Sequence, residues 1–490
     1  MVRTYLILFF EILIAILLAL ELVYVPTVLS SDFLGRVLVY VSVASGLFFL
    51  RKENQYALKR QYLKISNLFL IGFIIVHFQI YLDYVLGGYP DFGFDVMIND
   101  RLVPKASLIS ALALVSYYIG YLFASYFKTG TNHIQVNRIS TVIHSNKGVL
   151  LLMVVFLLLF LFSANWDYFN GNYGSVSVGS LADYAQESLL LSMIGYVLLF
   201  VRNERLIGRM YGNFIFYIKS LGSTFLVICG IYLFLVLISG DRGPILQFGI
   251  SLFGGYVLLA KRKMKFTVVL LFIFAGATFI SLLGFVREIG NGTDFWGRVD
   301  KAYTLRETSS IQSSISPSTL ELAGSVRTMH AAVDYAESRG HTNGLFQVFQ
   351  VISIVPGAGT VVKYFTGMEN TDFKSSAFLT RHILGANPDR GLGTTVVADI
   401  FLDFGTMGAV VIFFLFAWFI RYLEVNVYSA QFFRLSTLAL FFIFLSQALY
   451  IGRSTILVLF NEVVFLYVLL KVGLFVNSFL GYKKVKVSDK

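Results

Sequence analysis

The sequence predicts an all-α polytopic membrane protein with about twelve transmembrane helices and one large extracytoplasmic loop, and three observations lead to that fold class. The chain has 490 residues, of which 57% are hydrophobic and only 14% are charged. Its apolar residues come in runs of roughly twenty, which is the length an α-helix needs to cross a bilayer. One polar stretch of about 110 residues, 286–395, is far longer than an ordinary connection between helices.

The expected spans divide the chain into three parts. They cover about 5–23, 34–50, 65–86, 106–127, 149–164, 188–201, 220–238, 245–260, 266–285, 396–419, 435–451 and 455–475. Nine spans lie in 1–285, the large loop is 286–395, and three spans precede a basic tail in 396–490. The first span follows Arg3 without a small-residue cleavage site, so we expect it to be retained and not removed as a signal peptide. Both termini are then expected in the cytoplasm.

The charge pattern agrees with this topology. Segments expected inside are basic, for example 51–64 and 261–265, as the positive-inside rule requires. With this topology the inner side carries 10 Arg and 14 Lys, and the outer side carries 11 Arg and 4 Lys. Lipid headgroups need only positive charge, whereas bidentate binding of phosphate or carboxylate favours the planar guanidinium. The outer arginines therefore indicate an oxyanion ligand on that side.

Composition also argues against several classes of function. Cys229 is the only cysteine and lies in an apolar run, which leaves no disulfide framework and no thiolate metal site. We expect no bound metal and no cofactor. The net charge of +11 is explained by basic loops at the membrane surface, so we expect membrane lipids and not nucleic acid as partners.

Within the large loop, residues 316–340 are expected to form one amphipathic helix. Ser316 is a suitable cap, Pro317 suits a first helical position, and Gly340 is a helix stop. The apolar flank carries Leu322, Val326, Met329, Val333 and Ala336, and the polar flank carries Arg327, His330, Asp334 and Glu337. Two interpretations of the polar flank stay open: a solvated face on which His330 pairs with Asp334, or a substrate-facing His330.

Two further stretches follow in the loop. Residues 344–359 are apolar for too short a length to cross a bilayer, so a re-entrant or interfacial element is expected. Residues 375–408 hold the densest group of ionisable residues: Arg381, His382, Asp389, Arg390, Asp399 and Asp403. Asp399 and Asp403 share one helical face at the outer end of a span. Because intramembrane carboxylates are costly, a functional role is the default; pairing with arginines to orient the helix is the alternative.

Several isolated polar residues complete the set. Arg242, in "SGDRGP" at 239–244, and Arg453 occupy short outer turns, and each is either a headgroup anchor or a ligand-binding residue. Glu11 lies in the middle of the first span and is expected either to bond a polar neighbour or to serve a proton or ion path. His77 and Asp83, in the third span, are expected to be packing or interfacial residues.

These features together resemble the bacterial oligosaccharide repeat-unit polymerases, the Wzy-type polymerases of O-antigen and capsule. The family ends its large loop with a Gly-rich stretch, an acidic residue and F-G-x-x-G, and "GLGTTVVADIFLDFGTMG" at 391–408 is similar. Gly391, Gly393, Asp399, Phe404, Gly405 and Gly408 stand in those places. The acidic position is often Glu in the family, so Asp399 and Asp403 are both candidates for it. The related O-antigen ligases use an outer histidine with arginines, and His382 is a candidate match.

The resemblance implies a GT-C-like glycosyltransferase of the bacterial inner membrane, acting at the outer leaflet without a metal. It would transfer glycan from undecaprenyl diphosphate to the terminal sugar of another lipid-linked repeat unit, with a chain-length regulator protein as a possible partner. The catalytic candidates are Asp399, His382, Asp403 and His330. The diphosphate-binding candidates are Arg242, Arg287, Arg327, Arg381, Arg390 and Arg453.

Two alternatives stay open at this point. Twelve spans with both termini inside are also common in transporters, so a flippase for lipid-linked oligosaccharides is one; transporters, however, generally show two related halves, which are not evident here. The other alternative is an O-antigen ligase, which shares topology and mechanism with the polymerase and differs in its acceptor.

Overall fold

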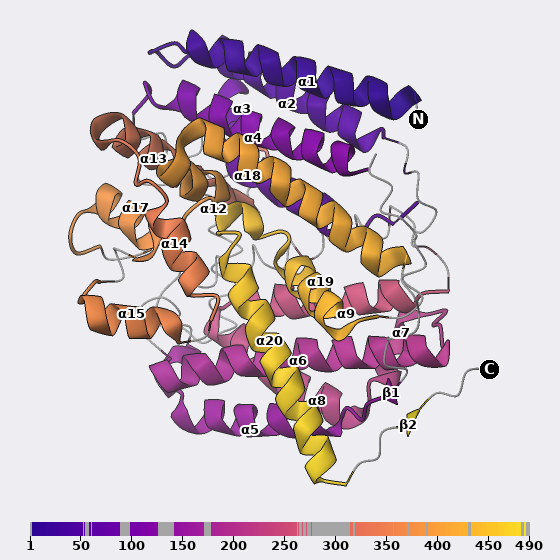
Figure 1. The fold of residues 1–490 in the computed structure, drawn as a ribbon. Coiled ribbons are helices and arrows are strands. Elements are labelled where there is room, and N and C mark those ends of the chain that lie inside the picture. The colour runs from indigo at the N-terminus through magenta and orange to yellow at the C-terminus, as the bar shows by residue number, and fades with distance from the viewer. Residues whose placement is uncertain are drawn as a thin grey trace.

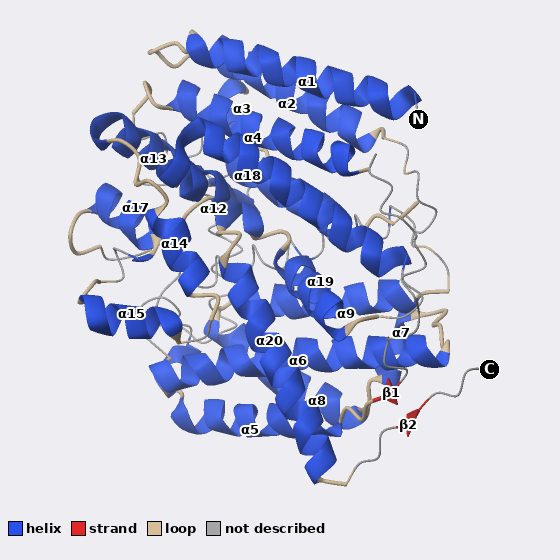
Figure 2. Cartoon of the chain, in the orientation of Figure 1, coloured by secondary structure: helices blue, strands red, loops and turns tan. Residues whose placement is uncertain are grey.

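The structure is a computed structural model, and it is almost entirely helical (Figure 2). It describes residues 2–51, 53, 58–59, 61–88, 99–125, 142–170, 178–261, 263, 267, 271, 276, 314–316, 319–355, 357–369, 373–388, 391–429, 433–481 and 485–486. Two short strands, β1 (Val142–Ile143) and β2 (Val485–Lys486), pair antiparallel. The expected all-α class is therefore confirmed for the described chain.

Helices occupy the expected spans wherever the chain is described. They are α1 (Val2–Val23), α2 (Ser31–Phe49), α3 (Ile65–Val85), α4 (Val103–Ala124), α5 (Lys147–Ser163), α6 (Ser180–Ile207), α8 (Ser223–Ser239), α9 (Gly243–Leu259), α18 (Val396–Ser429), α19 (Leu435–Gln447) and α20 (Val458–Phe479). Of the expected span 266–285, the structure describes only residues 267, 271 and 276. By length and composition, seven of the described helices can cross a membrane: α1, α2, α3, α4, α6, α18 and α20. Helices α5, α9 and α19 are shorter apolar helices, and α7 (Phe214–Ser220) meets α8 at a bend of 101°.

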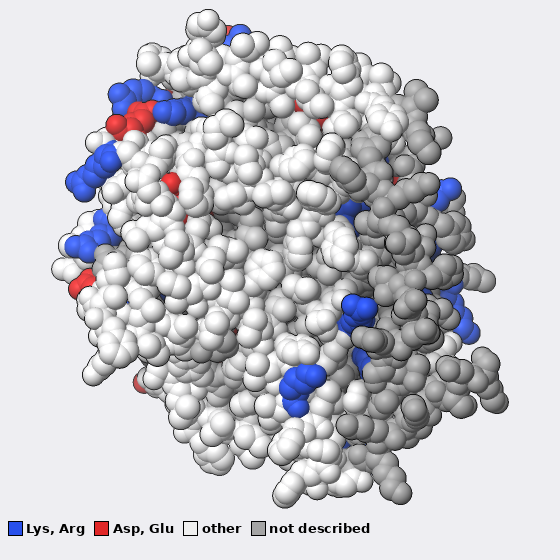
Figure 3. Space-filling view, in the orientation of Figure 1, with Lys and Arg blue, Asp and Glu red and all other residues white. Residues whose placement is uncertain are grey.

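Helices such as α1, α4, α18 and α6 run across the view in similar directions and α20 crosses them steeply, with the start of α1 and strand β2 at one end of the bundle (Figure 1). Helices α4 and α18 pack together in the middle, α1 and α2 pack on α4, and α5 packs on α6. The helices of the large loop gather at the opposite end, on the left of the view. Figure 3 shows charged side chains over α13 and α17 and toward the termini, with a largely uncharged surface between. Large apolar side chains such as Phe9 and Phe162 are exposed, which suits a helix surface surrounded by lipid tails.

Close packing of α4 on α18 depends on a small residue. A Cβ at Gly120 would lie 2.2 Å from the backbone oxygen of Phe414. Without a side chain at this position the two backbones can approach, which is the usual way helices associate where lipid removes the hydrophobic driving force. The contact fixes α18, and α18 carries the carboxylates considered below.

The large loop is built from short helices. They are α12 (Leu320–Ala323), α13 (Val326–Arg339), α14 (Leu345–Ile352), α15 (Ala358–Thr366) and α17 (Ser375–Leu384). The expectation of one helix over 316–340 was wrong, because the helix is interrupted at Gly324 and Ser325. Glycine is a poor helix former, and Ser325 N donates to the carbonyl only three residues back, Leu322 O, at 3.2 Å. The expected stop is confirmed, because Gly340 caps α13 with φ at +84°.

The stretch 344–359 forms α14, a turn and the start of α15, and neither helix is long enough to span a bilayer. That is compatible with the interfacial element expected from the sequence. Two turns of 3-10 helix, η2 (Trp166–Asn170) and η5 (Ile451–Arg453), complete the elements.

Candidate functional site

Two arginines from separate turns meet at one carboxylate of the large loop. Arg242 Nη2 donates to Glu321 Oε2, and Arg453 Nη1 lies 3.6 Å from Glu321 Oε1. Arg242 precedes α9, Arg453 ends η5, and Glu321 is on α12. We refer to these three residues as the Glu321 cluster. Its geometry shows that two neighbouring oxygens of a single anion can reach both guanidinium groups.

The turns that carry the cluster are held by local chemistry. Asp241 Oδ1 accepts from Gly243 N at 3.1 Å, and Asp241 Oδ2 accepts from Gln186 Nε2 at 3.3 Å, which ties the turn to α6. Next to Arg453 lies the Gly-rich stretch: a Cβ at Gly393 would be 3.8 Å from Arg453 Nε. The Arg242 side chain is only 12% exposed, so it lies partly out of water, where an oxyanion partner is worth more than at an open surface.

The α3 helix holds the segment just before α12. Asp83 accepts from Ile315 N at 2.8 Å and from Ser314 Oγ at 2.7 Å. Gln79 Oε1 accepts from Thr319 Oγ1 at 2.6 Å. Asp83 is therefore more than the packing or interfacial residue expected: it fixes the start of the segment that presents Glu321.

Asp399 and Asp403 share one face of α18, as expected, and both are buried. Asp403 accepts from Thr342 Oγ1, from Gln347 N at 2.8 Å and from Phe346 N at 3.3 Å. A carboxylate in this position caps the N-terminus of α14 and complements its dipole.

Asp399 accepts from three side chains of the large loop. They are Gln347 Nε2 at 2.7 Å, Gln350 Nε2 at 2.9 Å and the hydroxyl of Ser375. These partners are amides and a hydroxyl, whereas the alternative considered from the sequence was pairing of the carboxylates with arginines. With their oxygens engaged in this way, the two carboxylates serve to moor α14 and α17 to the span.

The two candidate histidines differ in their surroundings. His330 is fully buried, and its Nε2 lies 2.8 Å from the hydroxyl of Tyr81 on α3. The expected pairing of His330 with Asp334 was wrong, because the Asp334 carboxylate instead meets His382 Nε2, at 3.0 Å. That pair joins α13 to α17, with the His382 ring set edge-on to Tyr335. Sequence periodicity could not find it, because 48 positions separate the two residues.

The remaining arginine candidates are distributed over the loop. Arg327 is half-buried on α13, and Arg381 is exposed on α17. Arg287 and Arg390, together with Asp389, lie outside the described residues. Among the described residues, no group of His, Cys, Asp and Glu is arranged to hold a metal ion.

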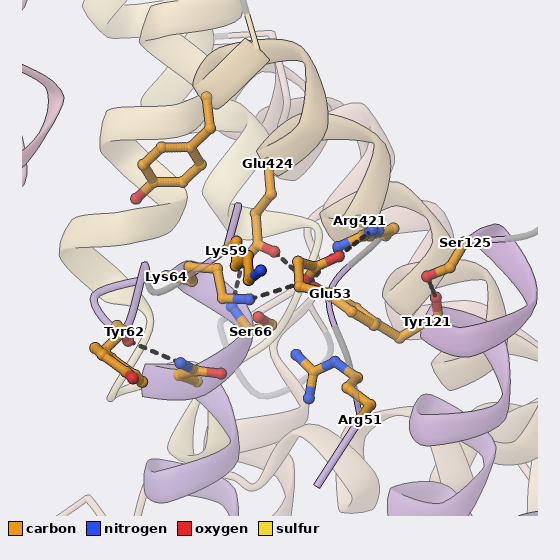
Figure 4. Close-up of polar contacts among 12 residues, drawn as sticks. Arg51, Glu53, Lys59, Tyr62, Lys64, Ser66, Tyr121, Ser125, Arg421 and Glu424 are labelled. Atoms are coloured by element: carbon orange, nitrogen blue, oxygen red, sulfur yellow. Dashed lines mark hydrogen bonds and ion pairs between the residues drawn. The ribbon is translucent and has the colours of Figure 1, made fainter. Parts of the chain in front are cut away.

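A second charged group, absent from the sequence predictions, gathers side chains from the segment between α2 and α3, from α4 and from α18 (Figure 4). It consists of Arg51, Glu53, Lys64, Tyr121, Arg421 and Glu424, and we call it the Arg421 cluster. Arg421 Nη2 donates to Glu53 Oε1 at 2.5 Å, and Lys64 Nζ lies 3.4 Å from Glu53 Oε2. Glu424 accepts from Tyr121 Oη at 2.7 Å and from Ser66 N at 2.8 Å.

The electrostatics of Glu53 show how tightly this cluster is coupled. Burial by itself would raise the pKa of the Glu53 carboxyl, but Arg421, Lys64 and Arg51 outweigh it and lower that pKa to about 2. The sequence signal was weak: Arg421 and Glu424 follow the expected end of their span at 419, and only the continuation of α18 to Ser429 brings them into the bundle.

Two of the ionisable side chains in the spans are among the buried groups that have no hydrogen-bond partner in the described part of the chain. These are the carboxyl of Glu11 and both ring nitrogens of His77. The polar neighbour expected for Glu11 is thus not seen among the described residues. His77 stacks on Phe73 with ring centroids 4.2 Å apart, which fits the packing role expected for it.

Comparison of the whole chain with protein-family models, curated protein sequences and solved structures gives no significant match. The geometry above and the motifs at 239–244 and 391–408 are therefore the features that bear on the function of this chain.

Proposed function

We propose that this protein is a membrane glycosyltransferase that polymerises lipid-linked oligosaccharide repeat units, as its resemblance to the Wzy-type polymerases implies. The observation that carries the proposal is the Glu321 cluster, in which Arg242 and Arg453 reach the two oxygens of one carboxylate beside Gly393. Arg242 and Arg453 are two of the residues that the sequence singled out for diphosphate binding, and Gly393 belongs to the Gly-rich stretch that carries the family resemblance. A diphosphate offers the same pair of neighbouring oxygens with more charge, so it would compete with Glu321 for the guanidinium groups.

The proposal includes a topology. Twelve spans, with 266–285 as one of them, would leave both termini in the cytoplasm and the large loop outside the bacterial inner membrane. The fold supports this arrangement, because the start of α1 and strand β2 lie at one end of the bundle and the loop helices at the other (Figure 1). The Glu321 cluster would then lie at the depth of outer-leaflet headgroups, where undecaprenyl diphosphate carries its phosphates.

The arginines would act on the leaving group. In the reaction, the bond between the donor sugar's anomeric carbon and the diphosphate oxygen breaks, and the electron pair leaves with the diphosphate. Fixed cations in a partly dehydrated site stabilise that developing charge, and loss of one such contact costs about 2.7–4 kcal/mol of barrier in comparable oxyanion sites. Arg242 and Arg453 are suited to this because each is held at the mouth of the bundle by a separate turn.

Of the four catalytic candidates, His382 is the best placed to act as a base. The acceptor hydroxyl must lose a proton as its oxygen bonds to the anomeric carbon, and an imidazole oriented by a carboxylate can accept it. Asp334 supplies that carboxylate at 3.0 Å. Helix α17 also contacts the Gly-rich stretch, since Thr380 Oγ1 accepts from Leu392 N at 3.1 Å. The other three candidates are buried. His330 is hydrogen-bonded to Tyr81, and the two aspartates of α18 accept hydrogen bonds from α14 and α17.

The direct test is glycan transfer by purified protein with a lipid-diphosphate oligosaccharide. Arg242→Ala and Arg453→Ala should each lower kcat by at least about a hundredfold, and His382→Ala by roughly a hundred- to ten-thousand-fold. Glu337→Gln is the matched control, because Glu337 is another carboxylate of the loop that pairs with two cations, Arg101 at 3.0 Å and Lys105 at 2.9 Å. It should leave the rate unchanged.

A test in the native host separates the alternatives. Deletion of the protein should leave single repeat units on the cell surface if it is a polymerase. Complete loss of surface glycan would indicate a flippase, and accumulation of untransferred lipid-linked polymer would indicate a ligase.

If purified Arg242→Ala and Arg453→Ala proteins made normal polymer, the diphosphate role of the Glu321 cluster would be wrong, and the cluster would be an ion-pair link between loop and bundle.

A further inference from the structure

A basic cavity of about 320 Å³ lies at the end of the bundle that carries the termini. Three cations line it: Arg205 on α6 and Lys261 and Lys263 just after α9. Among the described lining residues there is no Asp or Glu. The rest of the wall is largely apolar and includes Val257 and Phe433. The cavity is thus lined by cations together with apolar side chains.

Backbone contacts hold the cations in place. Tyr211 N donates to Leu259 O at 2.8 Å, and Lys261 N donates to Tyr211 O at 2.8 Å, which joins the end of α9 to the segment after α6. Arg205 Nη1 lies 3.3 Å from Met210 Sδ, and its guanidinium carbon lies 5.9 Å from the centre of the Phe433 ring. A thioether and an aromatic ring leave most of the hydrogen-bonding capacity of a guanidinium unused.

A carboxylate of the described chain pairs with a neighbouring arginine, but not with Arg205 or Lys261 of the cavity. One turn beyond Arg205, Arg209 is paired with Glu204 at 3.6 Å. In contrast, neither Arg205 nor Lys261 forms an ion pair with any described carboxylate. The C-terminal carbonyl groups of α6 and α9 would also attract cations. That attraction does not explain why the cations line a cavity together with apolar side chains.

We infer that the cavity binds the phosphate of an anionic phospholipid from the leaflet on the side of the termini. Basic pockets between membrane helices bind lipid head groups through this combination of charge and position. The cations are at the ends of membrane helices, the depth at which a lipid presents its phosphate, and the apolar wall suits the glycerol and first methylenes. Inorganic phosphate carries the same charged group, but it has no apolar part to contact the apolar side chains of the cavity. The inference is independent of the proposed enzymatic activity.

Native mass spectrometry of the purified full-length protein tests the inference, with phosphatidylglycerol and phosphatidylcholine as probes. The protein should retain phosphatidylglycerol preferentially. Because a basic residue near a lipid surface contributes roughly fivefold, Lys261→Gln should weaken phosphatidylglycerol binding about fivefold and Arg205→Ala with Lys261→Ala about 25-fold. Binding of phosphatidylcholine should not change in either variant.

The control is Arg209→Ala, which removes a neighbouring cation that is outside the cavity and already paired. It should keep the preference of the wild-type protein. Lys261 is exposed, so Lys261→Gln gives a result even if the double variant does not fold. Undiminished preference for phosphatidylglycerol in Lys261→Gln and in the double variant would overturn the site. Displacement of phosphatidylglycerol by an equal concentration of inorganic phosphate would overturn the lipid as its occupant.

Discussion

Replacing Glu53 with Gln should destabilise the protein by about 3 kcal/mol at neutral pH. The magnitude follows from the fall of the Glu53 pKa from 4.5 to about 2, since a tenfold change in proton affinity is worth about 1.4 kcal/mol. The side chain is 12% exposed, so solvent screening removes little of this value. Breaking a buried ion pair by removal of one partner gives a similar estimate, about 3–5 kcal/mol. The Glu53 carboxylate accepts from Arg421 at 2.5 Å, and in the Gln variant the Arg421 guanidinium would lose this carboxylate partner.

The pH dependence of the effect has a definite sign. Because folding lowers the Glu53 pKa, its contribution is fully present above about pH 4.5 and is lost as the pH falls toward 2. The difference between wild type and Glu53→Gln should therefore be constant from pH 5 to 8 and roughly 1 kcal/mol smaller at pH 3.5. A carboxyl with an ordinary pKa would give no such pattern.

The single cysteine provides the assay. Cys229 is buried, so a thiol-reactive dye that fluoresces on coupling reports unfolding of the detergent-solubilised protein. The melting temperature of Glu53→Gln should fall by about 3–6 °C, since the shift for each kcal/mol decreases with chain length. The control is Arg36→Ala, which removes an exposed pair with Glu21 at 3.7 Å and should cost less than about 1 kcal/mol. A melting temperature for Glu53→Gln that equals that of Arg36→Ala would refute the reasoning.

Three further predictions concern packing and the attachment of the loop. Gly120→Leu should push α4 from α18 and cost at least about 1–3 kcal/mol, measured by the same dye assay, because its Cβ would lie 2.2 Å from Phe414 O; an unchanged melting temperature would contradict this. Asp403→Ala removes the acceptor for Phe346 N and Gln347 N, so hydrogen exchange over 344–352 should quicken by roughly fivefold or more, as expected for a lost cap worth about 1 kcal/mol. Asp83→Ala should likewise quicken exchange at Ile315, and protection equal to wild type would show that Asp83 does not hold this segment.

The sequence allowed much of the fold to be predicted, because the bilayer permits few solutions. A chain in hydrocarbon must satisfy its backbone internally, so long apolar runs become helices almost regardless of context. For that reason the expected and observed bounds of α3, 65–86 and Ile65–Val85, nearly coincide. The prediction failed at Gly324 and Ser325, where a poor helix former interrupts a helix that has suitable end signals.

The candidate site was predictable only in part. Sequence reasoning chose Arg242, Arg453 and the carboxylates of α18, since fixed charges at membrane depth are uncommon. It did not find Glu321 or the His382–Asp334 pair, because residue type alone does not show which distant charge a side chain will meet. The carboxylates of Asp399 and Asp403 illustrate the limit: their positions were anticipated, but their partners on α14 and α17 were not.

The sequence by itself determined that this is an all-α membrane protein and which segments form its apolar helices, because hydrophobic length is a local property that lipid converts directly into helix. Only the tertiary structure decided how charges are paired. Arg421 and Glu53 are 368 positions apart, and Arg242 and Glu321 are 79 apart. Such pairs depend on which helices pack together and on how far the helices are shifted along their axes. Packing is set by the shapes of entire helix surfaces rather than by any one stretch of sequence.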